Sequence, residues 1–237
     1  MSDGFIDLSF GENDNDLSTK GRSFKAKEGE SYRVSFAWWP TGEDGTPDFT
    51  AKSPQFIGVK RGFIDKVGKV VDKPELRPFY KQDPQIRAAT IIVIWPTDDE
   101  GEIDAARLKK GKYQILTWDL PGSKYEEIKK IGLRHPYSER DLQVDCSDAN
   151  FQKMTFMPLP ESMFAKLATS GKPIGEELLS RVAKHAEGIK DDLAKDLSLA
   201  EVKQRLNGDQ EAAAGPSAAT EANTAAVDSA LDDLLDD

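Results

Sequence analysis

Several short segments in the first 160 residues carry the apolar patterns of β-strands, and these patterns constrain the fold more than any other feature of the chain. In the clearest segment, residues 31–39, bulky side chains alternate from Tyr32 to Trp38 until Pro40 ends the pattern. Turns rich in Gly and Asp, at 41–45 and 98–101, separate neighbouring segments as in an antiparallel meander, and a long basic loop is expected at 62–85. The other strand-like segments are residues 55–62, 87–95, 112–120, 142–146 and 152–157.

A helix with signals at both ends interrupts this β pattern. Ser123 and Glu126 have the S-x-x-E spacing of a capping box, and Gly132 follows as a stop signal. The body thus combines roughly five β elements with one helix inserted before the last of them. This order favours a mainly β fold, an OB-fold-like Greek-key barrel with one inserted helix.

After Pro160 the pattern changes from strand-like to helical. Helices are predicted at 161–169, at 175–197 and from a second capping box, Ser198 and Glu201, to Asn207. Beyond them Ala, Ser, Thr and Glu dominate, and such residues bury too little apolar surface to order the chain. The expected parts are a flexible N-terminal arm at 1–20, an OB-fold-like core at 21–160, a helical segment at 161–206 and a disordered acidic tail at 207–237.

The composition excludes several classes of protein. One cysteine, Cys146, cannot form an internal disulfide, and with only His135 and His185 beside it there is no ligand set for a structural zinc site. The longest apolar run, 88–95, is far too short to span a bilayer, and the acidic N-terminus lacks the layout of a secretory signal, so we expect a cytoplasmic location. No catalytic motif is present, which predicts a protein that is not an enzyme and uses no cofactor or metal.

Charge is distributed unevenly along the chain. The net charge is -10, but residues 161–237 contain 8 basic and 16 acidic side chains, so most of the excess lies near the C-terminus. Residues 52–87, in contrast, contain nine basic and four acidic side chains. An otherwise acidic protein therefore carries a locally basic strip, which is a typical footprint of phosphate binding.

Aromatic residues interleave with these cations, and the combination suits single-stranded nucleic acid. A single strand offers phosphates to cations and unstacked base faces to aromatic rings. Arg33 and Trp39, on the face of the first strand opposite its apolar set, extend the same surface. Alternatively, Phe56 and Phe63 are core residues and the lysines solvate an exposed loop. The candidate nucleic-acid-binding residues are Arg33, Trp39, Lys60, Arg61, Phe63, Lys66, Lys69, Arg77, Phe79, Tyr80, Lys81 and Arg87.

The C-terminal tip is a second candidate site. No basic residue follows Arg205, and leucines recur at helical spacing among the final aspartates. Such a segment competes with phosphate for the basic strip, or docks on a partner as a short amphipathic helix. The alternative is a solubility tail, although such a tail needs no regularly spaced leucines. The candidate partner-binding residues are Leu231, Asp232, Asp233, Leu234, Leu235, Asp236 and Asp237.

These parts together resemble the single-stranded DNA-binding proteins encoded by DNA bacteriophages. The resemblance lies in KYQILTWDLPGSKYEEIKKIG at 112–132 and in DLQVDCSDANFQKMTFMPLP at 141–160, with the acidic tip as an independent likeness. It implies an OB-fold core that coats single-stranded DNA in replication, recombination and repair with low sequence preference, inside an infected bacterial host. It also implies replication or recombination proteins as partners of the tail. This chain departs from the pattern by ending in Asp236 and Asp237 rather than in an aromatic residue.

Two other functions fit the same features. A protein-interaction adaptor would use the β body and helices to bind partners and the tail as a recruitment peptide. An RNA-binding regulator on the same fold would differ in its response to the 2′-hydroxyl group. The helices predicted within 175–206 either pack on the β body or associate with a second copy.

Overall fold

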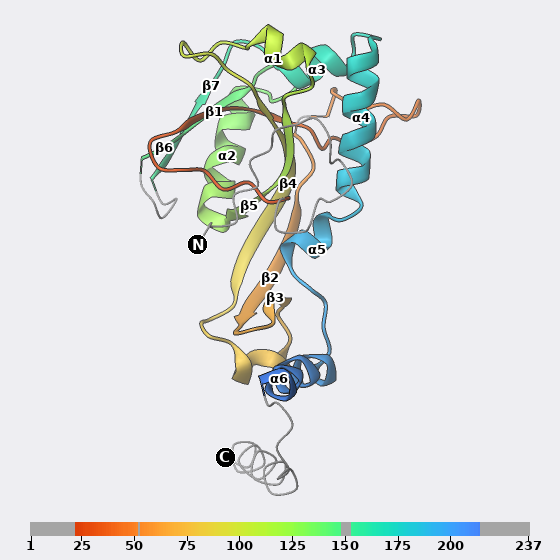
Figure 1. Ribbon diagram of the computed structural model, residues 1–237. Helices are drawn as coiled ribbons and strands as arrows, with labels where there is room; N and C mark the ends of the chain where they lie inside the picture. The colour runs from red at the N-terminus through yellow and green to blue at the C-terminus, as the bar shows by residue number, and fades with distance from the viewer. Residues whose placement is uncertain (1–21, 52, 148–152, 214–237) are drawn as a thin grey trace, which may run out of the picture. The chain divides into compact units, whose positions relative to one another are not determined.

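The computed structural model describes residues 22–51, 53–147 and 153–213 (Figure 1). The predicted N-terminal arm and the tail residues 231–237 lie outside the described residues. The chain divides into two compact units, residues 1–196 and 197–237. Within the described ranges, no helix combines the length and the apolar composition that crossing a bilayer requires.

The first unit is built on one antiparallel sheet, so the predicted mainly β fold is confirmed. The path through the sheet is β3-β2-β4-β1-β6-β7, and β5 pairs with the other edge of β4. The strands are β1 Ser31–Phe36, β2 Ile57–Ile64, β3 Gly68–Val71, β4 Gln85–Trp95, β5 Gln114–Pro121, β6 Leu142–Cys146 and β7 Met154–Pro158. The helices are η2 Pro74–Phe79, α1 Ala105–Lys109, α2 Gly122–Arg134, α3 Met163–Ala168, α4 Pro173–Ala186, α5 Ile189–Leu193 and, in the second unit, α6 Leu199–Ala213.

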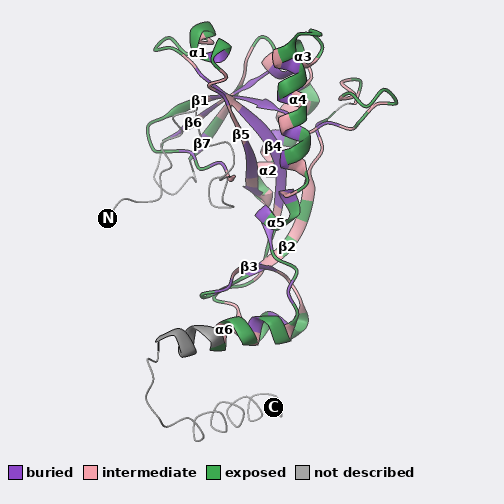
Figure 2. Ribbon diagram, turned by 45° about the vertical axis from the view of Figure 1, so that its right-hand side comes forward, coloured by how far each residue is buried: buried purple, intermediate pink, exposed green. Residues whose placement is uncertain are grey.

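The long strand β4 organises the sheet. Its first half, residues 85–89, pairs with β2, and its last part, residues 92–95, pairs with β1 on the same edge. Its other edge pairs with β5 over residues 87–94. Because β2 pairs only with the start of β4, the β2–β3 hairpin reaches beyond the rest of the sheet, away from α1 and α3 (Figures 1 and 2). We call residues 57–81 the hairpin extension.

Both faces of the central sheet are covered. On one face, Phe36 packs against the rings of Tyr137 and Trp118, and α2 adds its buried Ile128. On the other face, α4 and α5 contact β4 and β5, while α3 contacts β1. Ile91 and Ile92 are therefore both fully buried although neighbouring side chains of a strand point to opposite faces. The helices α3, α4 and α5 belong to the same unit as the sheet, and residues 161–206 are divided between the two units.

The end of the first unit adds to the sheet as well. The Lys195 N–H donates to the Lys69 carbonyl oxygen at 3.0 Å, and the Val71 N–H donates to the Lys195 carbonyl oxygen at 3.1 Å. Lys195 thus pairs in parallel with Val70 along the outer edge of β3.

The helix predicted after Ser123 is confirmed, but both of its proposed end signals are wrong. The helix α2 begins at Gly122, directly after β5, so Ser123 lies inside its first turn and no side chain caps it. Gly132 also lies inside α2, where a Cβ atom would stand 2.7 Å from the Tyr137 ring. The glycine is therefore needed for close packing and does not end the helix.

The other helix predictions are partly right. The segment 175–197 forms two helices, α4 and α5, rather than one. The second capping box is confirmed, because Ser198 N–H donates to the Glu201 carboxylate at 2.8 Å and Glu201 N–H donates to the Ser198 hydroxyl at 3.3 Å. Helix α6 continues past Asn207 to Ala213, so its predicted end is wrong. The predicted loop at 62–85 is also wrong in part, since it contains the short strand β3 and the helix η2.

Candidate nucleic-acid interface

The hairpin extension presents its basic residues on two opposite faces. Arg61 pairs in register with Gln85 and Phe63 pairs with Lys69, so these side chains share one face of the sheet. Lys60 pairs with Ile86, and both point to the opposite face. A single bound strand cannot contact both faces at the same position.

Three cations from three strands converge on one carboxylate, Asp119 of β5. Its Oδ2 atom accepts from Arg61 Nη2 at 2.7 Å and from Lys69 Nζ at 3.1 Å, and its Oδ1 atom accepts from Arg87 Nε at 2.8 Å. Burial alone would raise the pKa of Asp119, but the charges of Arg61, Arg87 and Lys69 outweigh it and lower the pKa. Asp119 is therefore ionised, and this cluster, the Asp119 cluster, holds two positive charges in excess.

The four side chains of the Asp119 cluster differ in exposure. The side chains of Asp119, Arg61 and Arg87 are 10, 12 and 17% exposed, whereas that of Lys69 is 40% exposed. Arg61 also donates to the Leu193 carbonyl oxygen at 2.7 Å, and Arg87 also donates to the Asp119 carbonyl oxygen at 3.1 Å. The two guanidinium groups are thus fixed from more than one side, and Lys69 is the cation most open to solvent.

An exposed aromatic ring lies on the same face as the Asp119 cluster. Phe63 is directly opposite Lys69 in the β2–β3 pairing and is 40% exposed. At the turn of the hairpin, Lys66 has a φ of 63° and an exposed side chain, and no hydrogen bond or ion pair of Lys66 is found among the described residues. This face therefore offers cations and a ring to one ligand.

On the opposite face of the hairpin extension, the polar candidate side chains are bonded to an aspartate or to the backbone. Asp72 accepts from Lys60 at 3.0 Å and from Arg77 at 3.2 Å. The Tyr80 hydroxyl accepts from the Lys73 N–H at 3.1 Å and donates to the Val71 carbonyl oxygen at 3.4 Å, so the ring is held against the sheet. Of the remaining candidates, Phe79 is half-buried and Lys81 pairs with Asp65 at 3.2 Å.

The contact between Gly62 and Tyr80 gives a test of this packing. A Cβ atom at Gly62 would stand 2.5 Å from the Tyr80 ring, whereas one at Gly58 of the same strand would meet only a carbonyl oxygen, at 4.0 Å. We expect Gly62→Ala to lower the free energy of unfolding by about 1–3 kcal/mol, because overpacking displaces the ring, and Gly58→Ala to change it little. Urea unfolding of both variants measures this, and equal effects would contradict the contact.

Two predicted interface residues lie in the interior of the first unit. Arg33 is 7% exposed, and its Nε atom donates to the buried Asp141 at 2.9 Å. Trp39 is 4% exposed, and its indole N–H donates to the Phe36 carbonyl oxygen while its ring meets Phe49 edge-on. Neither side chain joins the surface of the hairpin extension. The reason is that α3 and the loop before β2 cover the face on which alternation places them.

One buried constellation contains the residue types of a hydrolase triad but lacks its geometry. Thr117 Oγ1 lies 2.9 Å from His185 Nε2 and donates to Asp192 Oδ2 at 2.6 Å. The carboxylate lies on the same side of the imidazole as the hydroxyl, 3.9 Å from Nε2, so it cannot orient the ring from Nδ1. Burial lowers the pKa of His185 to about 4, and Thr117 is fully buried. The group therefore joins β5 to α4 and α5.

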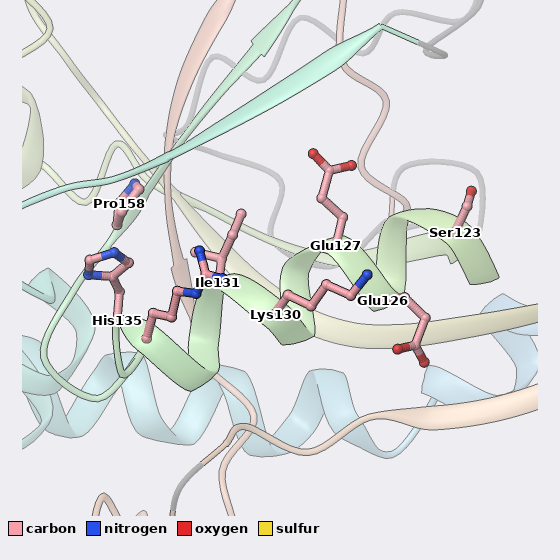
Figure 3. Close-up of a pocket in the computed structure, with 8 residues that line it drawn as sticks. Ser123, Glu126, Glu127, Lys130, Ile131, His135 and Pro158 are labelled. Atoms are coloured by element: carbon pink, nitrogen blue, oxygen red, sulfur yellow. The ribbon is translucent and has the colours of Figure 1, made fainter.

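A cavity of about 400 Å³ lies against α2 (Figure 3). Glu126 and Glu127 stand at one end, His135 stands near Pro158 at the other, and Lys130 lies between them (Figure 3); Arg134 also lines the cavity. These opposed charges do not favour a polyanion. In the described part of the chain, no group of three or more His, Cys, Asp and Glu side chains is arranged to hold a metal ion.

Sequence reasoning missed Asp119, the residue at the centre of the candidate interface. It is the single acidic residue of β5, whose other side chains are uncharged. A lone carboxylate in an otherwise neutral strand is the signal that could have found it, but its cationic partners follow only from strand pairing.

Comparison with known proteins found no protein-family model, no curated protein and no solved structure that matches this chain.

Proposed function

We propose that the protein binds single-stranded DNA through the face of the hairpin extension that carries the Asp119 cluster and Phe63. The observation that carries the proposal is the excess positive charge of Arg61, Lys69 and Arg87 next to a ring that is 40% exposed. Cations that follow the backbone and rings that stack bases are the two elements of single-strand recognition. The central strand β4 pairs with three strands, β1, β2 and β5, and an OB-fold-like arrangement of this sheet is the scaffold that we propose.

The same geometry favours low sequence preference. The guanidinium groups of Arg61 and Arg87 are held by Asp119 and by backbone carbonyls, so neither is free to read the edge of a base. Contacts to phosphate and stacking on Phe63 carry little sequence information. This agrees with a protein that coats single strands in replication, recombination or repair, with the acidic tail as a competitor for the cations and a docking peptide for partner proteins.

Phe63→Ala should weaken binding to a dye-labelled oligo-dT by about 1–3 kcal/mol, because one stacking platform is lost. Fluorescence anisotropy is the suitable measurement. Tryptophan fluorescence is not, since three of the four tryptophans, Trp39, Trp95 and Trp118, are 4% exposed or less, and the fourth, Trp38, is partly buried and lies outside the hairpin extension. Ile86→Ala, an apolar truncation on the opposite face, is the matched control and should leave the affinity unchanged.

The proposal fails if the unaltered protein shows no salt-dependent binding to oligo-dT, or if Ile86→Ala weakens binding as much as Phe63→Ala does. An RNA of the same length and base composition distinguishes the RNA-binding alternative, because the 2′-hydroxyl is the group that differs.

A further inference from the structure

We propose that Asp119 is a built-in counterion that phosphate must displace from Lys69, so that this one carboxylate sets how tightly the interface holds an anion. The identity of the natural anion, the DNA backbone, rests on the proposed function. The competition itself rests on the geometry of the Asp119 cluster.

The cluster has the donor set of a phosphate site, with a carboxylate in the place of the phosphate. Two guanidinium groups and one ammonium group direct charge-assisted hydrogen bonds of 2.7–3.1 Å at the two oxygens of Asp119. Arginine and lysine bind phosphate oxygens with the same bonds at the same distances. An approaching phosphate therefore meets cations that already have an anionic partner.

Of the three cations, Lys69 is the one that can change partner. Its bond to Asp119, 3.1 Å, is the longest of the three charge-assisted bonds, and its side chain is the most exposed. Arg61 and Arg87 have second acceptors on the backbone and stay in place when Lys69 turns outward. They then keep Asp119 neutralised, which lowers the cost of the exchange.

A purely structural role for the cluster predicts the opposite result. If Asp119 only fixes β2, β3 and β4 to β5, its loss loosens the hairpin extension and weakens any binding there. If Asp119 competes with a ligand, its loss strengthens anion binding even as the fold becomes less stable. The sign of the change in affinity separates the two roles.

The test compares Asp119→Asn with the unaltered protein in two measurements. Inorganic tripolyphosphate is added in thermal unfolding, and dye-labelled oligo-dT is titrated by anisotropy. We expect Asp119→Asn to unfold at a lower temperature without ligand and to bind both ligands about tenfold more tightly, because a like charge near the anion is removed. Asp72→Asn, which removes the same charge on the opposite face, is the matched control and should change both affinities by less than about threefold, through the change in net charge alone.

If folded Asp119→Asn binds tripolyphosphate no more tightly than the unaltered protein does, Asp119 does not compete with anions and the inference is overturned. If Asp119→Asn does not fold, Lys69→Gln serves as the second test. Lys69→Gln should weaken tripolyphosphate binding about fivefold. An unchanged affinity for tripolyphosphate overturns the role of Lys69. The inference and the proposed function can fail separately. Tighter tripolyphosphate binding by Asp119→Asn without any oligo-dT binding supports the anion site and removes the DNA function. In the opposite case, Lys69→Gln weakens oligo-dT binding but Asp119→Asn does not strengthen it. That result supports single-stranded DNA binding and overturns the competition between Asp119 and phosphate.

Discussion

Replacing Asp141 by alanine should lower the free energy of unfolding by about 3–5 kcal/mol, the cost of breaking a buried ion pair from one side. Asp141 is fully buried and accepts from Arg33 Nε at 2.9 Å, from the Ser35 hydroxyl and from the Met163 N–H at 3.1 Å. The variant leaves the Arg33 guanidinium buried without its main counterion. It also removes one of the bonds that hold the start of α3 to the sheet, because the Met163 N–H loses its acceptor, while the Phe164 N–H keeps the Ser35 hydroxyl at 3.3 Å.

Urea unfolding at pH 7 measures the effect, with Asp145→Ala of β6, the strand that directly follows Asp141, as the control. The Asp145 carboxylate is bonded by the neighbouring Gln143 side chain at 3.0 Å and is partly exposed, so its loss should cost well under 1 kcal/mol. A loss below about 1 kcal/mol for Asp141→Ala would mean that Arg33 finds another partner, against the expected cost.

The pH dependence gives a second readout of the same carboxylate. Burial raises the pKa of Asp141 to about 6, above its ordinary value of 3.8, in spite of the hydrogen bonds from Ser35 and Arg33. The folded state therefore binds a proton more tightly than the unfolded state between these values. The stability that Asp141 adds through proton binding is full below pH 4 and is lost as the pH rises through 6. Between pH 5 and pH 7, the free energy of unfolding of the unaltered protein should fall by about 1 kcal/mol more than that of Asp141→Ala.

Reversing the charge of Lys69 should weaken binding to single-stranded DNA by about a hundredfold at low salt, because two units of charge change next to the expected phosphate. Lys69→Glu places a second carboxylate beside Asp119 at the most exposed position of the cluster. The added repulsion acts on an anion in addition to the lost cation. Anisotropy titrations of oligo-dT at several salt concentrations measure both the affinity and its salt dependence.

Lys109→Glu, at an exposed position of α1, reverses the same charge at the end of the first unit opposite the hairpin extension (Figure 1). It should reduce the affinity by less than about threefold, through the change in net charge alone. If Lys69→Glu and Lys109→Glu weaken binding equally, DNA does not contact the Asp119 cluster. The ratio between the two variants should fall as salt is added, because salt screens exposed charges.

The sequence predicted where the strands lie better than which of their faces are buried. Alternation of bulky residues is a local signal, so the segments at 31–39 and 87–95 correspond closely to β1 and β4. The same signal placed Arg33 on a solvent face, because a strand pattern cannot show that α3 covers that face later in the chain. β3 was missed because four residues, Gly68 to Val71, are too few to show alternation.

The candidate site was predictable in composition but not in geometry. The excess of cations in 52–87 indicated a basic surface, and the structure divides those cations between two faces according to strand register. Which lysine or arginine shares a face with Phe63 depends on pairing between residues far apart in the sequence. Asp119 could not be identified as their common partner for the same reason, since β5 follows β2 by 50 residues or more.

The pairing of Lys195 with β3 bears on how the sheet is protected from pairing with another copy of the chain. An open sheet edge presents free N–H and C=O groups that can recruit a strand from another molecule and start aggregation. Residues after α5 cover that edge of β3 with a charged lysine, and at the far end of the sheet β7 is short and ends in Pro158, which has no N–H to donate. A chain shortened before Ala194 would lose the first of these safeguards. The covering residues thus leave less of the sheet edge open to a strand from another copy.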